Sequence, residues 1–484
     1  MAGSDWIVTA PTTITGDTLG IDGDVVVRAG ASLTISGSTL LVGGRILVED
    51  DAELRMVPYA GKAARLEPLD PVRGFSVHVE GSIMSEGNPP TVIEGLNGQG
   101  IRSVVYSTGG LIINGTADLR DIRIVNGTAG MIVGPFGYLD LRDAVLQNLS
   151  LAGIATLGEA RLENVSMADN IVGITARGAR CKVHVTSSHL VSRSASVDAI
   201  GCRVEVEDSH VEGTSYALRI QGKHARLSIL NSSVVGYQHA AFKGDGGGEV
   251  VMRNTTLVPA AGARNGFFLL PMSRLLLDNV SIVGHADHGI LAQGSDLTIQ
   301  GGRLMGNGGY GIRSVGGNVE LAGDPDFGSH ATANREGALA WIQRFTVLPM
   351  GPDNQTVPGL EFTLYAHGRD LPIFSAGNET TDAIDVMFNA FGHGGADPPS
   401  VAMPFTYRAT HPGLSGPVMG ELDFPPSPVL QIQVAAPSPP LGSEDHLAKP
   451  ASSPHLLLLV TALMLAVLLF RGRRAKSARH KERD

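Results

Sequence analysis

Three stretches share one pattern: ADLRDIRI at residues 117–124, LDLRDAVL at 139–146 and ARLENVSM at 160–167. In each stretch two apolar residues stand at alternate positions, a polar residue follows, and another apolar residue stands three positions after it. Alternation with a period of two predicts a β-strand that buries one face. Because the stretches return at nearly equal intervals, they indicate a repeat architecture in which each repeat packs on the next.

The pattern continues over nine repeats, and their polar residues, here called the polar column, stand 21 to 25 positions apart. The column consists of Asp121, Asp143, Asn164, Ser187, Asp208, Asn231, Asn254, Asn279 and, as a degenerate member, Gly301. The positions two and four earlier, and three later, are apolar in every repeat. We expect each coil to hold this strand and a second strand, which begins at pairs such as Gly153-Ile154. Asn126 and Asn148, five positions after the column, predict tight turns with a left-handed residue.

This repeat resembles the right-handed parallel β-helix of the pectate-lyase-like superfamily, over roughly residues 20–330. The resemblance implies an all-β solenoid, which we assign to residues 1–330. Polysaccharide lyases of this fold hold Ca²⁺ with outward carboxylates and use an Arg or Lys base, and its hydrolases use clustered Asp residues. The repeat predicts the fold much more strongly than the function.

The composition agrees with a turn-rich β architecture, because 62 of the 484 residues are glycine and only 5% are aromatic. The formal net charge is −10, although the last residues of the chain are strongly basic. An acidic body argues against nucleic acid as a partner.

The period of the repeat is lost after residue 335. The sequence ALAWIQRFTV at 338–347 alternates, and a Pro/Gly/Asn-rich turn at 349–359 leads into LEFTLY at 360–365. A strand, a turn and a further strand predict a small β-sandwich over residues 335–424, similar to Ig-like or carboxypeptidase-regulatory-like modules. The Pro-rich residues 425–454 predict an extended stalk.

The C-terminus contains an apolar run, HLLLLVTALMLAVLLF at 455–470, which carries no acidic or basic residue after His455. Seven Lys and Arg residues follow it within residues 471–484. This order predicts a single transmembrane helix at 455–470 with a cytoplasmic basic tail at 471–484, so the N-terminal body is expected outside the cell. A buried core helix and a tail-anchored protein with a cytoplasmic body are the alternatives.

The outward positions beside the polar column predict a charged patch over about five coils. The candidates for catalysis are Asp118, Arg120, Asp121, Asp140, Arg142 and Asp143. The candidates for ligand binding are Arg161, Glu163, His184, Glu205 and Glu207. Ca²⁺ is the cation that such carboxylates would hold. A solvated ladder of opposite charges explains the same residues without a site.

Two further groups of residues suggest local chemistry. His285, Asp287 and His288 supply metal-ligand types within four positions, although no further ligand is identified. Cys181 and Cys202 each stand six positions before a member of the polar column, so they should lie on adjacent coils about 4.8 Å apart. A disulfide and two unbonded thiols are both compatible with that spacing.

Nine Asn-x-Ser/Thr sequons occur in the chain. Six of these asparagines belong to the polar column or the turn positions, where stacked amides can hydrogen-bond from coil to coil. The candidates for glycosylation outside the repeat are Asn114, Asn354 and Asn378.

Together these features predict a monomeric, membrane-anchored, extracellular β-helix protein. Its role would be structural, adhesive or glycan-binding without turnover, with polysaccharides or surface glycans as partners. The alternative is a cell-surface polysaccharide lyase or glycoside hydrolase that uses the charged patch. Release of unsaturated sugars would distinguish the lyase from a protein that only binds.

Overall fold

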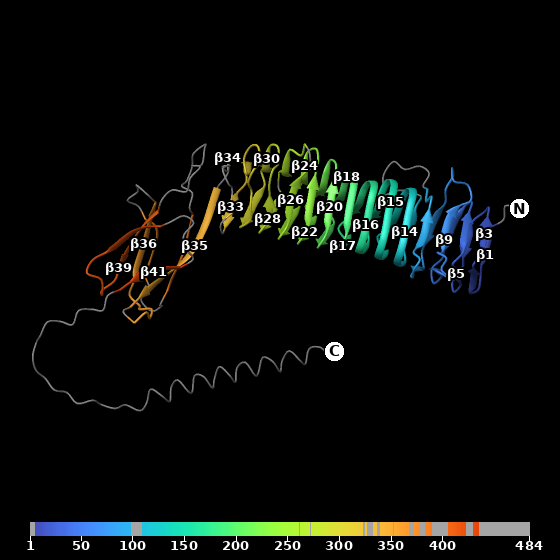
Figure 1. The fold of residues 1–484 in the computed structure, drawn as a ribbon, viewed down its shortest axis with the longest axis horizontal. Helices are drawn as coiled ribbons and strands as arrows, with labels where there is room; N and C mark the ends of the chain where they lie inside the picture. Colours follow the sequence, from blue (N-terminus) through green and yellow to red (C-terminus); the bar gives the residue numbers. More distant parts are fainter. Residues whose placement is uncertain are drawn as a thin grey trace, which may run out of the picture. The chain divides into compact units, whose positions relative to one another are not determined.

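The computed structural model describes residues 5–434, with gaps at 98–108, 261, 272, 323–324, 327–332, 336–338, 352, 367–371, 378–382, 390–404 and 423–428. Most of the described strands form a parallel β-solenoid of the right-handed type, with about thirteen coils (Figure 1). Equivalent strands of successive coils pair in parallel, and they build three sheets along the solenoid. The predicted all-β solenoid is therefore confirmed.

The first sheet carries the repeat that defines the sequence pattern. Its strands are β2 (Thr12–Thr15), β5 (Ser32–Ser36), β8 (Glu53–Val57), β11 (Ser82–Ser85), β17 (Lys182–Thr186), β19 (Arg203–Glu207), β22 (Arg226–Leu230), β25 (Glu249–Arg253), β28 (Arg274–Asp278), β31 (Asp296–Gln300) and β33 (Val319–Ala322).

The second sheet follows the polar column. Its strands are β3 (Thr18–Ile21), β6 (Thr39–Val42), β9 (Arg65–Pro68), β12 (Thr91–Glu94), β20 (His210–Gly213), β23 (Ser233–Gly236), β26 (Thr256–Pro259) and β29 (Ser281–Ile282).

The third sheet completes each coil. Its strands are β1 (Trp6–Val8), β4 (Val25–Val27), β7 (Arg45–Val48), β10 (Ser76–Val79), β13 (Leu111–Ile113), β21 (Tyr216–Gln221), β24 (Ala240–Asp245), β27 (Asn265–Leu269), β30 (His288–Gln293), β32 (Ile312–Val315) and β34 (Ala333–Arg335). Long bent strands contribute to more than one sheet, namely β14 (Thr116–Val133), β15 (Tyr138–Thr156), β16 (Glu159–Arg177) and β18 (His189–Ile200).

The register between coils agrees with the columns read from the sequence. Leu119 pairs with Leu141, and Leu141 pairs with Leu162, and all three side chains are buried inside the solenoid. The same column continues as a buried stack to Ile299. Burial of apolar side chains along the whole axis, at about 25 cal/mol per Å², is the main stabilisation of the fold.

The number of strands per coil differs from the prediction. The eight-residue pattern was expected to form one straight strand, but the chain bends sharply at the polar column, so that its two parts pair in different sheets. Strands β14, β15 and β16 continue through this bend, whereas from Ser187 onward the two parts are separate strands. Asp121, Asp143 and Asn164 have φ of 50°, 51° and 53°, which is the left-handed region that Asn and Asp adopt more readily than other residues. The polar column is therefore a corner between the first and second sheets. Asn126 and Asn148 are also left-handed, as predicted.

Side-chain amides hydrogen-bond along these corners, as the sequence indicates. The Nδ2 group of Asn254 donates to Oδ1 of Asn231 at 3.3 Å, and that of Asn279 donates to Oδ1 of Asn254 at 3.0 Å. Asn148 donates in the same way to Asn126 at 2.8 Å. These sequons thus have a structural use in the repeat.

The sequons outside the repeat differ in their surroundings. Asn114 is exposed, and its Nδ2 donates to Oε1 of Glu80 at 2.8 Å. Asn354 is exposed with a φ of 55°, and Asn378 lies outside the described residues. Glycosylation of these asparagines stays a prediction.

A small β-sandwich follows the solenoid. An antiparallel sheet in the order β37 (Pro372–Gly377), β36 (Glu361–Ala366), β39 (Phe405–Thr410) and β40 (Val418–Leu422) packs on three strands, β38 (Ile384–Asn389), β35 (Leu339–Met350) and β41 (Val429–Gln433). Strand β35 pairs with β33 at its beginning and with β38 and β41 further on, so it belongs to both the solenoid and the sandwich. The expected stalk at 425–454 is wrong for residues 429–433, because their apolar side chains alternate and add β41 to the sandwich.

The predicted membrane helix at 455–470 and basic tail at 471–484 lie outside the described residues. Within the described part of the chain, no helix has the length and apolar character needed to cross a membrane.

Candidate functional site

The predicted charged patch lies on the outer surface of the first sheet. In one row Asp118, Asp140, Arg161, His184 and Glu205 follow one another in register from coil to coil. The neighbouring row contains Arg120, Arg142, Glu163 and, two coils further on, Glu207. The sequence therefore placed these side chains on one surface correctly.

Ion pairs within and between strands occupy much of this patch. Arg120 contacts Asp118 at 3.2 Å, and Arg142 contacts Asp140 at 2.6 Å and Glu163 at 3.8 Å. Such ion pairs at a solvated surface neutralise the carboxylates. A carboxylate that acts as a general acid or base must instead be free to exchange a proton with the substrate. The geometry is that of a charge ladder, the alternative weighed from the sequence.

Asp121 and Asp143 do not belong to this surface, because they form the corners at the end of each first-sheet strand. Oδ2 of Asp121 accepts a hydrogen bond from the backbone N–H of Gly87 at 3.3 Å. Oδ1 of Asp143 accepts one from Asn164 at 2.5 Å. Their left-handed backbone and these bonds give them a structural role, so they are not brought together with Asp118 and Asp140 in a catalytic group.

A shallow depression of about 480 Å³ lies at the far end of the patch, among residues that include Arg161, His184 and Glu205. Nδ1 of His184 lies 3.3 Å from Glu205, and Arg203 contacts Glu205 at 2.6 Å. Burial alone would raise the pKa of Glu205, but hydrogen bonds from Arg203 and His184 lower it. Glu205 is therefore an ionised partner of two basic groups.

The proposed metal trio is not assembled. His285 is buried in the interior, with 1% of its surface exposed, whereas Asp287 and His288 face outward. Asp287 forms an ion pair with Arg264 at 2.7 Å. Among the residues that the structure describes, no group of three or more His, Cys, Asp or Glu side chains could hold a metal ion. The metal prediction is wrong because the turn before β30 sends the two histidines in different directions.

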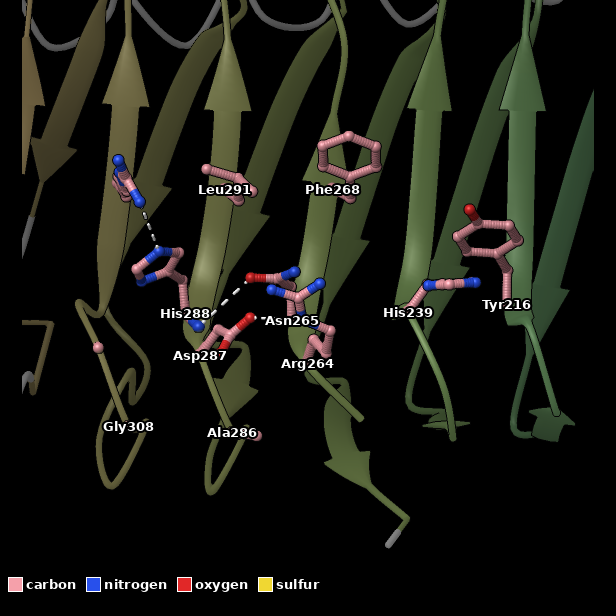
Figure 2. Close-up of a pocket in the computed structure, with 12 residues that line it drawn as sticks. Tyr216, His239, Arg264, Asn265, Phe268, Ala286, Asp287, His288, Leu291 and Gly308 are labelled. Carbon is pink, nitrogen blue, oxygen red and sulfur yellow. Dashed lines mark hydrogen bonds and ion pairs between the residues drawn. The ribbon is translucent and has the colours of Figure 1, made fainter. Parts of the chain in front are cut away.

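A second candidate site is a groove on the outer surface of the third sheet, which the sequence analysis did not predict (Figure 2). Its volume is about 490 Å³, and it extends across strands β21, β24, β27, β30 and β32. The lining residues are Tyr216, His239, Arg264, Asn265, Phe268, Ala286, Asp287, His288, Leu291, Gly308, Gly309 and Arg313.

Two rows of side chains build the groove, as Figure 2 shows. Residues at the starts of the strands form one row, in which Asn265 and His288 pair in register. Three positions further along each strand, Phe268, Leu291 and Arg313 form the second row. Because these positions alternate with buried residues such as Phe267, their side chains point away from the core.

Aromatic rings stand at both ends of the groove. Tyr216 and His239 have ring centroids 5.8 Å apart at one end. The rings of His288 and Tyr310 are stacked at the other end, also at 5.8 Å. Lys243, in register with Phe268, places its Nζ 5.4 Å from the centre of the Tyr216 ring. The groove thus combines apolar surfaces with cationic groups.

The polar groups at the centre of the groove are mutually bonded. The N–H of His288 donates to Oδ1 of Asn265 at 3.3 Å, while Arg264 donates to Asp287. Nδ1 of His288 accepts the backbone N–H of Tyr310 at 3.1 Å, and Arg313 lies 3.2 Å from its Nε2. Burial lowers the pKa of His288, and the charge of Arg313 lowers it further against the opposite effect of Asp287. The imidazole is therefore neutral at neutral pH.

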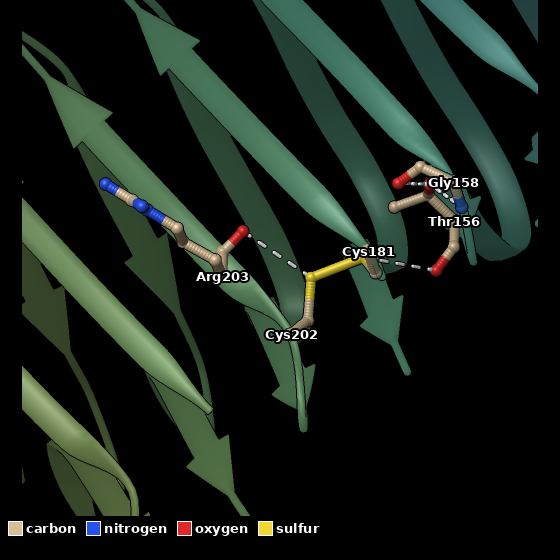
Figure 3. Close-up of a disulfide and its surroundings, with 5 residues drawn as sticks. All are labelled: Thr156, Gly158, Cys181, Cys202 and Arg203. Carbon is tan, nitrogen blue, oxygen red and sulfur yellow. Dashed lines mark hydrogen bonds between the residues drawn. A yellow bond between two sulfur atoms is a disulfide. The ribbon is translucent and has the colours of Figure 1, made fainter. Parts of the chain in front are cut away.

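Cys181 and Cys202, on adjacent coils, form a disulfide with a Cα–Cα distance of 5.0 Å (Figure 3). Both side chains are buried, and the bond joins the residues immediately before β17 and β19. It crosslinks the two coils that carry His184 and Glu205. Of the two alternatives left open by the spacing, the structure has the bonded one.

The disulfide leads to a simple prediction. Thiol titration of the unfolded, unreduced chain should detect no free thiol, and titration after reduction should detect two. Two titratable thiols before reduction would show that the coils stack without the crosslink.

The fold and the groove define the class of protein, which is a parallel β-helix with a hollow of ligand size on the outside of one sheet. No family model matches the chain, and no curated protein matches it either. Among solved structures, the periplasmic alginate epimerase AlgG is similar over 67% of this chain and 78% of its own, with 10% identity and a TM-score of 0.35. A double mutant of that enzyme gives 11% identity and a TM-score of 0.32 over the same shares. Similarity at this level says nothing about the activity or ligand of this chain.

Proposed function

We propose that the protein binds a carbohydrate chain in the groove and does not cleave it. The observation that carries this proposal is the group of apolar and aromatic side chains in the groove, Tyr216, Phe268 and Leu291, beside the polar groups of Asn265 and Arg313. Sugar rings present apolar C–H faces together with hydroxyl groups, so they can use both kinds of surface at once.

The arrangement of carboxyl groups supports binding without turnover. Asp287 is the carboxylate that lines the groove, and Arg264 neutralises it. Burial raises the pKa of Asp198, against the effect of Arg219 and Arg177, and Asp198 lies on the same sheet. Four coils separate its strand from β30, or about 19 Å at 4.8 Å per coil, whereas glycoside hydrolysis requires carboxyl groups about 5–9.5 Å apart.

In this proposal the solenoid is displayed outside a cell, anchored by residues 455–470. The apolar run and the basic residues after it support this location. The disulfide supports it as well, because such bonds persist in oxidising compartments.

The test uses the full chain on an array of neutral and acidic oligosaccharides, followed by titration calorimetry on the best ligand. Phe268→Ala is expected to weaken binding about tenfold, because covering a side chain of this size is worth about 1.5 kcal/mol. Phe136→Ala is the matched control, since Phe136 is 83% exposed and does not line the groove.

The same ligands are incubated with the protein and examined for new reducing ends and for unsaturated sugars. We expect neither product. Binding to no member of the array would overturn the proposal, and release of either product would replace it with the polysaccharide lyase or glycoside hydrolase.

A further inference from the structure

His288 has an unusual environment, because both of its ring nitrogens face N–H groups. The backbone N–H of Tyr310 lies 3.1 Å from Nδ1. The Nη1 group of Arg313 lies 3.2 Å from Nε2. A neutral imidazole has one acceptor nitrogen and one N–H donor, so it can accept from only one of these groups.

The backbone contact decides which nitrogen carries the proton. The amide of Tyr310 is fixed by the fold and can only donate, so Nδ1 must accept and the ring proton is on Nε2. Arg313, in contrast, is an exposed side chain that can reorient. Two donors, His288 Nε2–H and the Arg313 guanidinium, therefore lie side by side at the groove.

Two acceptor side chains that line the same groove, Asp287 and Asn265, already have partners. The carboxylate of Asp287 is paired with Arg264 at 2.7 Å. Oδ1 of Asn265 accepts the backbone N–H of His288 at 3.3 Å. A ligand oxygen can replace water and accept from both donors at once, and one with negative charge also matches the cationic Arg313.

We propose that His288 Nε2–H and the Arg313 guanidinium together bind one oxyanion of the ligand, a carboxylate or a sulfate ester carried by the carbohydrate. The two substituents share this chemistry, since each offers charged oxygens to two adjacent N–H donors. The identity of the carrier rests on the proposed carbohydrate function, whereas the oxyanion site is testable separately with an inorganic ion.

The first experiment is NMR of the full chain labelled with ¹⁵N and ¹³C in its histidines, with the His288→Gln variant as the assignment control. In the free protein, His288 should carry its proton on Nε2. Sodium sulfate, compared with sodium chloride at equal ionic strength, should shift the His288 signals and raise its pKa. A proton on Nδ1, or equal effects of sulfate and chloride, would overturn the site.

The second experiment compares three oligosaccharides of one backbone, which are neutral, carboxylated or sulfated. Arg313→Gln should weaken binding of the charged ligand about 10- to 100-fold more than it weakens binding of the neutral ligand, because only the charged ligand loses a paired oxyanion. Arg274→Gln is the matched control, because Arg274 is an exposed arginine of β28 on the first sheet. Preference for the carboxylated or for the sulfated ligand supports the site and identifies the substituent.

The two proposals fail in different ways. Equal affinity for the neutral and charged oligosaccharides would overturn the oxyanion site and leave carbohydrate binding in place. A sulfate response at His288 without binding of any oligosaccharide would support the oxyanion site and overturn the carbohydrate as its carrier.

Discussion

Replacing Phe267 with alanine is expected to lower the free energy of unfolding by about 3–5 kcal/mol, the range for deleting a buried aromatic ring. Phe267 lies in β27 and is fully buried. Its ring packs on Phe242 of the preceding coil, with centroids 5.2 Å apart. The substitution would leave a cavity between two coils, directly behind the outward Phe268. Equilibrium unfolding in urea, followed by far-UV circular dichroism, measures the loss.

Neighbouring substitutions separate this effect from ligand binding. Phe268→Ala should mainly weaken ligand binding and have little effect on stability, because that side chain alternates with Phe267 and faces the groove. Phe136→Ala should change stability by less than about 0.5 kcal/mol, as expected for a surface residue. Because each coil contacts only its neighbours, amide exchange should accelerate most in β24, β27 and β30. A loss below about 1 kcal/mol in Phe267→Ala would contradict the packing of this core.

The stacking of the coils could be predicted from the sequence because the apolar columns repeat in every coil. A residue such as Leu141 has to meet Leu162 if all inward positions are to be buried together, and the register has this pairing. The corner at the polar column was not predicted. Its residues are Asp, Asn and Ser, which adopt positive φ less obviously than glycine does, so one strand was expected where two meet.

The groove could not be predicted because its residues follow no constant spacing. The sequence interval from Asp208 to Tyr216 is shorter than the interval from Asn254 to Asn265, because the connection to the third sheet differs in length between coils. Pairing of β21, β24, β27 and β30 brings these positions side by side in space. The positions of the charged patch, in contrast, keep a fixed offset from the polar column, so this patch could be predicted from the sequence.

Acidification is expected to destabilise the protein through His285. This side chain is 1% exposed, and burial lowers its pKa to about 4, against a smaller opposite effect from the backbone of Leu257. In the unfolded chain the same group titrates near 6.5. Between these two values the unfolded state binds more protons than the folded state, so stability falls as the pH falls.

The size of this effect follows from the difference between the two pKa values. The stabilisation is fully present above about pH 6.5, is lost as the pH falls toward about 4, and amounts to about 3 kcal/mol at 1.36 kcal/mol per unit. Protonation of His189, whose pKa is lowered mainly by burial and further by the stacked His210, acts in the same direction.

The chain itself offers a matched replacement for His285. Leu149 occupies the equivalent place in another coil: its backbone N–H donates to Oδ1 of Asn170, as that of His285 donates to Asn307, both at 3.0 Å. Leu149 is fully buried, so His285→Leu should keep the packing and remove the titration. Urea unfolding at pH 7.5 and pH 4.5 should therefore show a loss about 2.5 kcal/mol smaller in His285→Leu than in the parent chain, since most of the effect is present by pH 4.5.

A second variant tests whether burial is the cause. His224 is exposed in the turn before β22, so His224→Leu should lose as much stability on acidification as the parent chain. Carboxylates titrate in all three proteins and cancel from the comparison. Equal losses in the parent chain and in His285→Leu would mean that the interior admits the charged imidazole, for instance by local opening of the turn between β29 and β30.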